Sequence, residues 1–146
     1  MNKIKQSLWS SSITLGLKSL TKPIAYVCLV LISSLSFASE DITQDALLKM
    51  EESSRLLLDV RTVEEYASGH IPTSINVPLD EVDTSLKSLM EFKDAPIVVY
   101  CRSGRRAGKA ISILEENGFT NVMHLEGDMS AWEAANRPTN QAPTKN

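Results

Sequence analysis

The chain has 146 residues and carries 15 basic against 18 acidic side chains, for a formal net charge of −3. This length allows one domain of ordinary size around one buried core. The acidic balance argues against nucleic acid as a partner, because polyanions bind to basic surfaces.

The first 38 residues have the composition of a secretory signal peptide. They contain four lysines and no acid, and the apolar run PIAYVCLVLISSLSFA, which begins at Pro23, ends in Ser36, Phe37 and Ala38. A basic region, a short apolar region and small residues three and one positions before a cut are the order of such a signal. The sequence therefore predicts a signal peptide over residues 1–38 and export to the periplasm.

An uncleaved signal would make this segment a membrane anchor instead. The uncharged stretch of residues 23–39 has 17 residues, which is the bottom of the range for spanning a bilayer, so we favour cleavage. Cys28 follows Tyr26 and Val27, whereas lipid attachment would need a small residue just before the cysteine. We interpret Cys28 as an apolar residue of the removed peptide.

The exported part of the chain keeps a single cysteine, Cys101, among 11 basic and 18 acidic residues, a net charge of −7. Cysteines in an oxidising compartment normally pair with one another. A lone thiol there is reactive, paired between chains, or deeply buried.

Short strand patterns alternate with helical ones over residues 39–137, the predicted folded domain. Residues 56–60 (LLLDV) form an apolar run around one aspartate, as in a strand that is covered on both faces. Thr62 and Glu65 have the spacing of a capping box at the start of the next helix, which Gly69 ends.

The later elements follow the same alternation. Residues 75–79 (INVPL) predict a short strand that Pro78 confines to the end of a sheet. Residues 80–91 predict a helix with acids in its first turn, and residues 97–100 predict the next apolar strand. The helix after that strand ends at Gly118.

The last predicted strand covers residues 121–125, and the last predicted helix covers residues 129–136. Strands that alternate with helices indicate an α/β fold, in which a parallel sheet has right-handed crossovers and helices on both faces. Residues 138–146 predict a disordered tail.

The stretch VVYCRSGRRAGKAISIL, residues 98–114, runs from an apolar strand through Cys101 and a loop into a helix. In a parallel sheet, the useful crevice lies beyond the carboxyl ends of the strands, where loops lead into helix N-termini. Ser103 and Gly104 allow the loop to turn its backbone N–H groups inward to bind an anion. The helix that begins near Arg105 adds its positive end.

Three arginines add charge to this loop: Arg102, Arg105 and Arg106. They favour a thiolate over a thiol at Cys101, and they attract an incoming anion. The alternative is that the cysteine is a small core residue and that the arginines are merely solvated. Because that alternative must also account for the glycine in the turn, we favour a nucleophilic cysteine.

The length of the loop separates two chemistries. Cysteine phosphatases need an arginine six positions after the cysteine, and that position is Ala107 here, whereas Arg106 lies five positions after Cys101. The resulting six-residue loop resembles that of the rhodaneses, a family of sulfurtransferase domains. Residues 59–78 (DVRTVEEYASGHIPTSINVP) resemble the family's first signature, and residues 125–132 (LEGDMSAW) resemble its second.

This resemblance implies a rhodanese-like α/β fold, with a central parallel sheet of about five strands, and a persulfide mechanism. The Cys101 thiolate would attack the outer sulfur of a small anionic donor such as thiosulfate, and a nucleophilic acceptor, cyanide or a thiol, would then remove that sulfur. No metal or organic cofactor is implied. The residues that would bind the donor's charge are Arg102, Ser103, Gly104, Arg105 and Arg106.

One residue departs from the family pattern. The family commonly has a second glycine after Gly127, and this chain has Asp128. We expect a carboxylate close to the pocket to weaken the binding of an anion.

Four other polar residues are candidates for a part in the site or in its support. Asp59 and Arg61 flank the end of the first apolar strand, where they either form an ion pair that braces the loop or lie at the surface. His70 is interpreted as a structural histidine that bonds to backbone. His124 lies in a strand with no pattern of partners, and these histidines make no zinc site with one cysteine.

Two alternatives to an active sulfurtransferase stay open. One is a non-catalytic or sulfur-carrier binding module of the same fold. The other is a redox-active thiol protein, in which Cys101 would form a sulfenic acid that no second cysteine of the exported chain could resolve.

Overall fold

The computed structural model describes residues 40–141. The predicted signal peptide, its cut after Ala38, and Cys28 lie outside the described residues. Within that part of the chain, no helix is long and apolar enough to cross a membrane.

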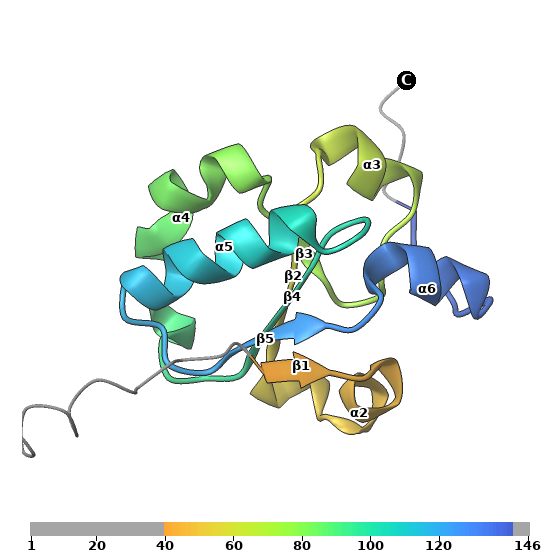
Figure 1. Cartoon of the computed structure of the whole chain (residues 1–146), viewed down its shortest axis with the longest axis horizontal. Helices are drawn as coiled ribbons and strands as arrows, with labels where there is room; N and C mark the ends of the chain where they lie inside the picture. The colour runs from red at the N-terminus through yellow and green to blue at the C-terminus, as the bar shows by residue number, and fades with distance from the viewer. Residues whose placement is uncertain (1–39, 142–146) are drawn as a thin grey trace, which may run out of the picture. The chain divides into compact units, whose positions relative to one another are not determined.

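Five parallel strands form one sheet in the order β1-β5-β4-β2-β3, as the sequence predicts for an α/β fold (Figure 1). Of the three inner strands, β2 and β4 are buried at every position because their sequences are almost entirely apolar. The strands are β1 (Glu40–Ile42), β2 (Leu56–Asp59), β3 (Ile75–Asn76), β4 (Ile97–Tyr100) and β5 (Val122–Leu125).

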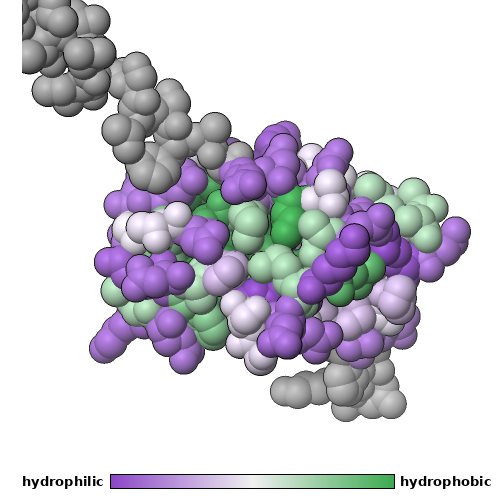
Figure 2. All heavy atoms as spheres, turned by 90° about the horizontal axis from the view of Figure 1, so that it is seen from below, coloured by the Kyte–Doolittle hydropathy of each residue, from purple (hydrophilic) through white to green (hydrophobic). Residues whose placement is uncertain are grey.

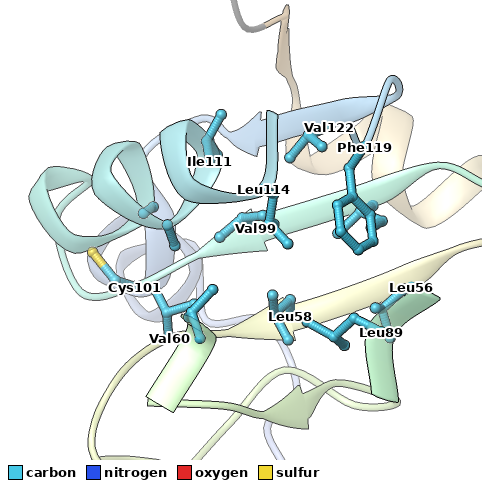
Figure 3. Packing of buried hydrophobic residues seen from close by; sticks show 14 residues of the cluster. Leu56, Leu58, Val60, Leu89, Val99, Cys101, Ile111, Leu114, Phe119 and Val122 are labelled. Atoms are coloured by element: carbon cyan, nitrogen blue, oxygen red, sulfur yellow. The ribbon is translucent and has the colours of Figure 1, made fainter. Parts of the chain in front are cut away.

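Helices cover both faces of this sheet, as predicted. Alternate side chains of β2 and β4 pack into two separate apolar clusters, one against α4 and α5 and the other against α2 and α6. Figure 3 shows the first cluster, with Cys101 at its end and the sulfur directed away from Val60 and Leu58. The helices are α2 (Gln44–Lys49), α3 (Val63–Ser68), α4 (Val82–Leu89), α5 (Arg105–Glu116) and α6 (Asp128–Ala134).

The predicted capping box at the start of α3 is confirmed. The Thr62 Oγ1 accepts a hydrogen bond from the Glu65 N–H, and the Glu65 carboxylate accepts one from the Thr62 N–H. The box fixes where α3 begins and holds Glu65 on the side of the helix that faces the loop after β4, where Glu65 pairs with Arg106.

Two predicted elements differ in extent from those observed. The strand predicted over residues 75–79 ends at Asn76, because Pro78 has no N–H to continue the ladder. The helix predicted over residues 80–91 is α4 flanked by two short 3₁₀ turns, Leu79–Glu81 and Met90–Phe92. A further 3₁₀ turn, Glu52–Ser54, precedes β2.

The prediction of a disordered tail from residue 138 is wrong for its first residues. The backbone of Asn140 pairs with that of His70 through two hydrogen bonds of 2.9 Å. The Trp132 indole N–H donates to the Pro138 carbonyl over 2.9 Å. These bonds hold the segment against the domain although its composition is polar.

One face of the described domain is largely polar. Figure 2 shows one face, on which hydrophilic side chains predominate and smaller hydrophobic areas lie between them. Four large apolar side chains are substantially exposed, and they come from four different parts of the chain: Leu48, Val63, Ile75 and Met90.

Candidate functional site

The loop of residues 101–106 joins the carboxyl end of β4 to the N-terminus of α5, as predicted. The Gly104 N–H donates to the Cys101 Sγ over 3.2 Å, and the φ angle of Gly104 is +88°, in the left-handed region. A β-carbon at this position would lie 3.2 Å from the Asp128 Oδ2 and 3.4 Å from the His124 Cε1. Glycine is therefore required at position 104, both because the φ angle is positive and because side chains pack closely behind it.

The carbonyl groups at the start of the loop face α6. The Cys101 carbonyl accepts from the Met129 N–H over 3.1 Å, and the Arg102 carbonyl accepts from the N–H and the hydroxyl of Ser130. The first N–H groups of α5 have no acceptor within that helix. The loop thus uses its carbonyls to bind α6 and presents N–H donors beside the sulfur, which suits an anion.

Cys101 is a free cysteine with 1% of its surface exposed, and it packs in the apolar cluster between the sheet and α5. Cys101 directly follows the carboxyl end of β4, where the sequence places it. It is also buried, as the alternative of a core residue predicts. Such burial keeps bulk water from the sulfur, so an anion formed there depends on the N–H donors around it.

Arg106 closes the loop by pairing with α3. Its guanidinium binds both carboxylate oxygens of Glu65, over 2.6 and 2.8 Å, and each side chain is 29% exposed. The hydrogen bonds from Arg106 lower the pKa of Glu65 to about 2, and the same pair raises the pKa of Arg106. Arg102 and Arg105 are exposed and make no ion pair within residues 40–141, so no carboxylate of that part of the chain is paired with them.

We expect the Glu65→Gln substitution to lower the free energy of unfolding by about 1 kcal/mol at neutral pH, a modest value because solvent screens the pair. Glutamine keeps the capping box, so the loss reports the ion pair alone. The carboxylate is stabilised by folding, so its contribution is complete above pH 4.5 and is lost as the pH falls towards about 2. Urea unfolding of both proteins at several pH values measures this difference.

The neighbouring Glu64→Gln substitution is the matched control, because Glu64 is exposed and has no ion pair within the described residues. A difference between Glu65→Gln and the unmodified chain that stays constant down to pH of about 3 would contradict the assignment.

Of the two arrangements considered for Asp59 and Arg61, the structure shows the ion pair, and it is buried. The Arg61 Nη2 lies 2.7 Å from the Asp59 Oδ2, with side-chain exposures of 3% and 0%. Burial lowers the pKa of Arg61 and the Asp59 carboxylate raises it, and the carboxylate prevails. The same guanidinium donates to the Gly69 carbonyl over 2.7 Å and lies 5.8 Å from the centre of the Tyr100 ring. The pair therefore braces the end of β2 against Gly69 and Tyr100, without a hydrogen bond to residues 101–106.

Asp128 lies close to the loop, as the sequence predicts, whereas His124 has partners that the sequence around it does not indicate. The His124 Nε2 lies 3.0 Å from the Asp128 Oδ2, and the Nδ1 lies 3.1 Å from the Asp41 Oδ1. The interpretation of His124 as a histidine without partners is therefore wrong. Asp128 is 2% exposed and accepts the Cys101 N–H at its Oδ1 over 2.7 Å, so it lies behind the loop.

His70 has the structural role that the sequence predicts. Its Nδ1 lies 2.9 Å from the Tyr66 carbonyl oxygen, and its ring stacks on that of Tyr66 with centroids 3.7 Å apart. Within residues 40–141, no group of three His, Cys, Asp or Glu side chains is arranged to hold a metal ion.

Comparison with known proteins gives one family. The family model described as "Rhodanese-like domain" matches residues 43–135. The thiosulfate sulfurtransferase PspE of Escherichia coli (strain K12) is 39% identical over 70 residues, which are 48% of this chain and 67% of that protein. A sulfurtransferase of Allochromatium vinosum is 36% identical over 77 residues, which are 53% of this chain and 70% of that protein.

A longer protein and a solved structure are also similar to this chain. The tRNA uridine(34) hydroxylase of Cronobacter sakazakii is 32% identical over 82 residues, 53% of this chain and 24% of that protein. The crystal structure of a rhodanese-related protein from Thermoplasma volcanium superposes with a TM-score of 0.63 and 28% identity. The superposition covers 70% of this chain and 99% of the Thermoplasma volcanium chain.

Proposed function

The chain belongs to the rhodanese-like domain family, and from this we propose that it moves sulfane sulfur from thiosulfate, through a persulfide on Cys101, to cyanide or a thiol. Similarity to proteins named as sulfurtransferases supports the general class of reaction. The donor, the acceptor and the site residues are our own assignment.

The observation that carries this proposal is the position of the Cys101 sulfur. The sulfur lies between the end of β4 and the start of α5, and the Gly104 nitrogen donates a hydrogen bond to it over 3.2 Å. Donors that are already in place stabilise a negative sulfur without any rearrangement during the reaction. The short, six-residue loop from Cys101 to Arg106 suits an added sulfur atom better than a phosphoryl group.

In the first half-reaction, the Cys101 thiolate attacks the outer sulfur of thiosulfate. The sulfur–sulfur bond of the donor breaks, sulfite leaves with the electron pair, and a persulfide remains on the enzyme. In the second half-reaction, cyanide attacks the outer persulfide sulfur, thiocyanate leaves, and the Cys101 thiolate is restored. Two such steps through a covalent intermediate give ping-pong kinetics.

We assign different roles in this reaction to the arginines of the loop. Arg102 and Arg105 are exposed, with no ion pair among residues 40–141, and they attract the dianionic donor to an otherwise acidic protein. Arg106 is bound to Glu65, so we assign it to holding the loop closed. Ser103 and Gly104 contribute backbone N–H groups.

We also propose that the reaction takes place in the periplasm, after removal of the signal peptide of residues 1–38. The basic and apolar regions of that segment support export. N-terminal sequencing of the protein from an exporting cell tests this, and a chain that begins at residue 39 is the expected result.

The direct test of the function is the intact mass of the purified protein before and after reaction with thiosulfate, and again after cyanide. We expect a gain of one sulfur atom that cyanide removes. No gain by a protein whose Cys101 was first reduced and then freed of the reductant would overturn the proposal. The non-catalytic binding module, which the 1% exposure of Cys101 favours, would then take first place.

A further inference from the structure

Three ionisable side chains from three different elements form a continuous polar chain behind the cysteine. Asp41 of β1, His124 of β5 and Asp128 of α6 are linked by contacts of 3.1 and 3.0 Å. The parallel register of β1 and β5 sets Asp41 beside His124. The chain ends at the Cys101 N–H, which Asp128 binds over 2.7 Å.

This chain lies directly against the loop that surrounds the sulfur. The Asp128 Oδ2 and the His124 Cε1 are the atoms nearest to the free side of Gly104, 3.2 and 3.4 Å from where a β-carbon would stand. Gly104 in turn donates its N–H to the Cys101 Sγ. The His124 and Asp128 side chains are thus separated from the sulfur by one glycine.

Both ring nitrogens of His124 face a carboxylate oxygen. A neutral imidazole has one N–H donor and one acceptor lone pair, so it satisfies one carboxylate and turns a lone pair towards the other. The imidazolium donates to both. An imidazolium at this place would therefore donate to Asp41 and Asp128 at once, and its charge would offset that of a carboxylate at the buried Asp128.

We propose that His124 is a positioning residue that neutralises Asp128, so that Asp128 holds the Cys101 backbone without repelling an anionic sulfur donor. Removal of the positive ring would leave one uncompensated negative charge behind Gly104. That charge opposes a dianion at the loop more than it opposes a neutral reagent. The inference rests on the proposed function only in naming thiosulfate as the anion.

The first test is the steady-state kinetics of His124→Gln. Glutamine keeps a donor for Asp128 but carries no charge, so we expect KM for thiosulfate to rise about tenfold, with kcat changed less than about twofold. His124→Gln combined with Asp128→Asn should return KM to within about twofold of the original value, because the pair is again neutral. His70→Gln, at a histidine outside this chain of contacts, is the matched control and should leave KM unchanged.

Rescue by the second substitution separates charge from structure. If the contacts only stabilise the fold, losing both groups should harm the site at least as much as losing one. A double variant with KM equal to or higher than that of His124→Gln would overturn the proposal.

A second measurement does not depend on sulfur transfer. The Cys101 thiolate displaces iodide from iodoacetate, an anion, or from iodoacetamide, which is neutral, and the ratio of the two rates reports the charge near the sulfur. We expect this ratio to fall severalfold, about threefold or more, in His124→Gln and to recover in the double variant. If the ratio behaves so but the protein takes no sulfur from thiosulfate, the proposed function fails and this inference stands. An unchanged ratio in a protein that does take up sulfur would refute this inference alone.

Discussion

Replacement of Cys101 by serine is expected to reduce sulfur transfer from thiosulfate to cyanide by more than about a thousandfold. The hydroxyl is close to the thiol in size and still accepts the Gly104 N–H, but an oxygen at this position cannot carry the sulfane sulfur as a persulfide. The fold should therefore persist while the reaction stops. Thiocyanate formation measures the rate, and intact mass measures the loss of the sulfur-loaded form.

Cys101→Ala controls for the hydroxyl of the serine variant, and urea unfolding shows whether either variant has lost its structure. Transfer by Cys101→Ser within about tenfold of the original rate would contradict the persulfide mechanism. Another nucleophile would then have to carry the sulfur.

The second large effect concerns the buried ion pair. Arg61→Met is expected to lower the free energy of unfolding by about 3–5 kcal/mol, because it leaves the Asp59 carboxylate buried and uncompensated. Asp59 and Arg61 are 0% and 3% exposed, so water does not replace the lost partner. Such a loss is a large part of the total stability of an ordinary domain, which is about 5–15 kcal/mol. Urea unfolding at neutral pH measures it.

Two further variants make this prediction specific. Arg137→Met removes a guanidinium that pairs with Asp45, a residue 76% exposed, and should cost about 1 kcal/mol or less. Asp59→Asn combined with Arg61→Met should recover part of the loss, because no buried charge then lacks a partner. If Arg61→Met costs no more than Arg137→Met, the buried pair does not have the stabilising role assigned to it.

Much of the fold follows from local patterns in the sequence. The apolar runs of β2 and β4 are long enough to predict strands buried on both faces, and the Thr62 and Glu65 spacing sets the start of α3. Strand β1 escaped prediction because Glu-Asp-Ile has no apolar pattern, and it exists only through pairing with β5. The order of the residues just after 137 also escaped prediction, because hydrogen bonds to distant segments hold a polar sequence in place.

In the candidate site, too, the local features could be predicted and the contacts between distant residues could not. The loop from Cys101 to Arg106 is continuous in sequence, so its position and its glycine could be predicted. The partners of His124 could not, because Asp41 is 83 positions away and is brought near only by the order of the strands. Asp128, four positions from His124, is the one partner whose spacing could have given a signal, although the two residues lie in different elements.

The strands at the two borders of the sheet are short. Strand β1 has three residues, two of which are acidic, and strand β3 is only two residues long. A long, flat, apolar border would present unpaired backbone groups on which a second copy of the chain could add its own strand. These borders offer little length for such pairing, and Glu40 and Asp41 place negative charge along one of them. The sheet is thus built to resist edge-to-edge aggregation, and concentrated solutions of the folded domain should stay free of β-stacked assemblies.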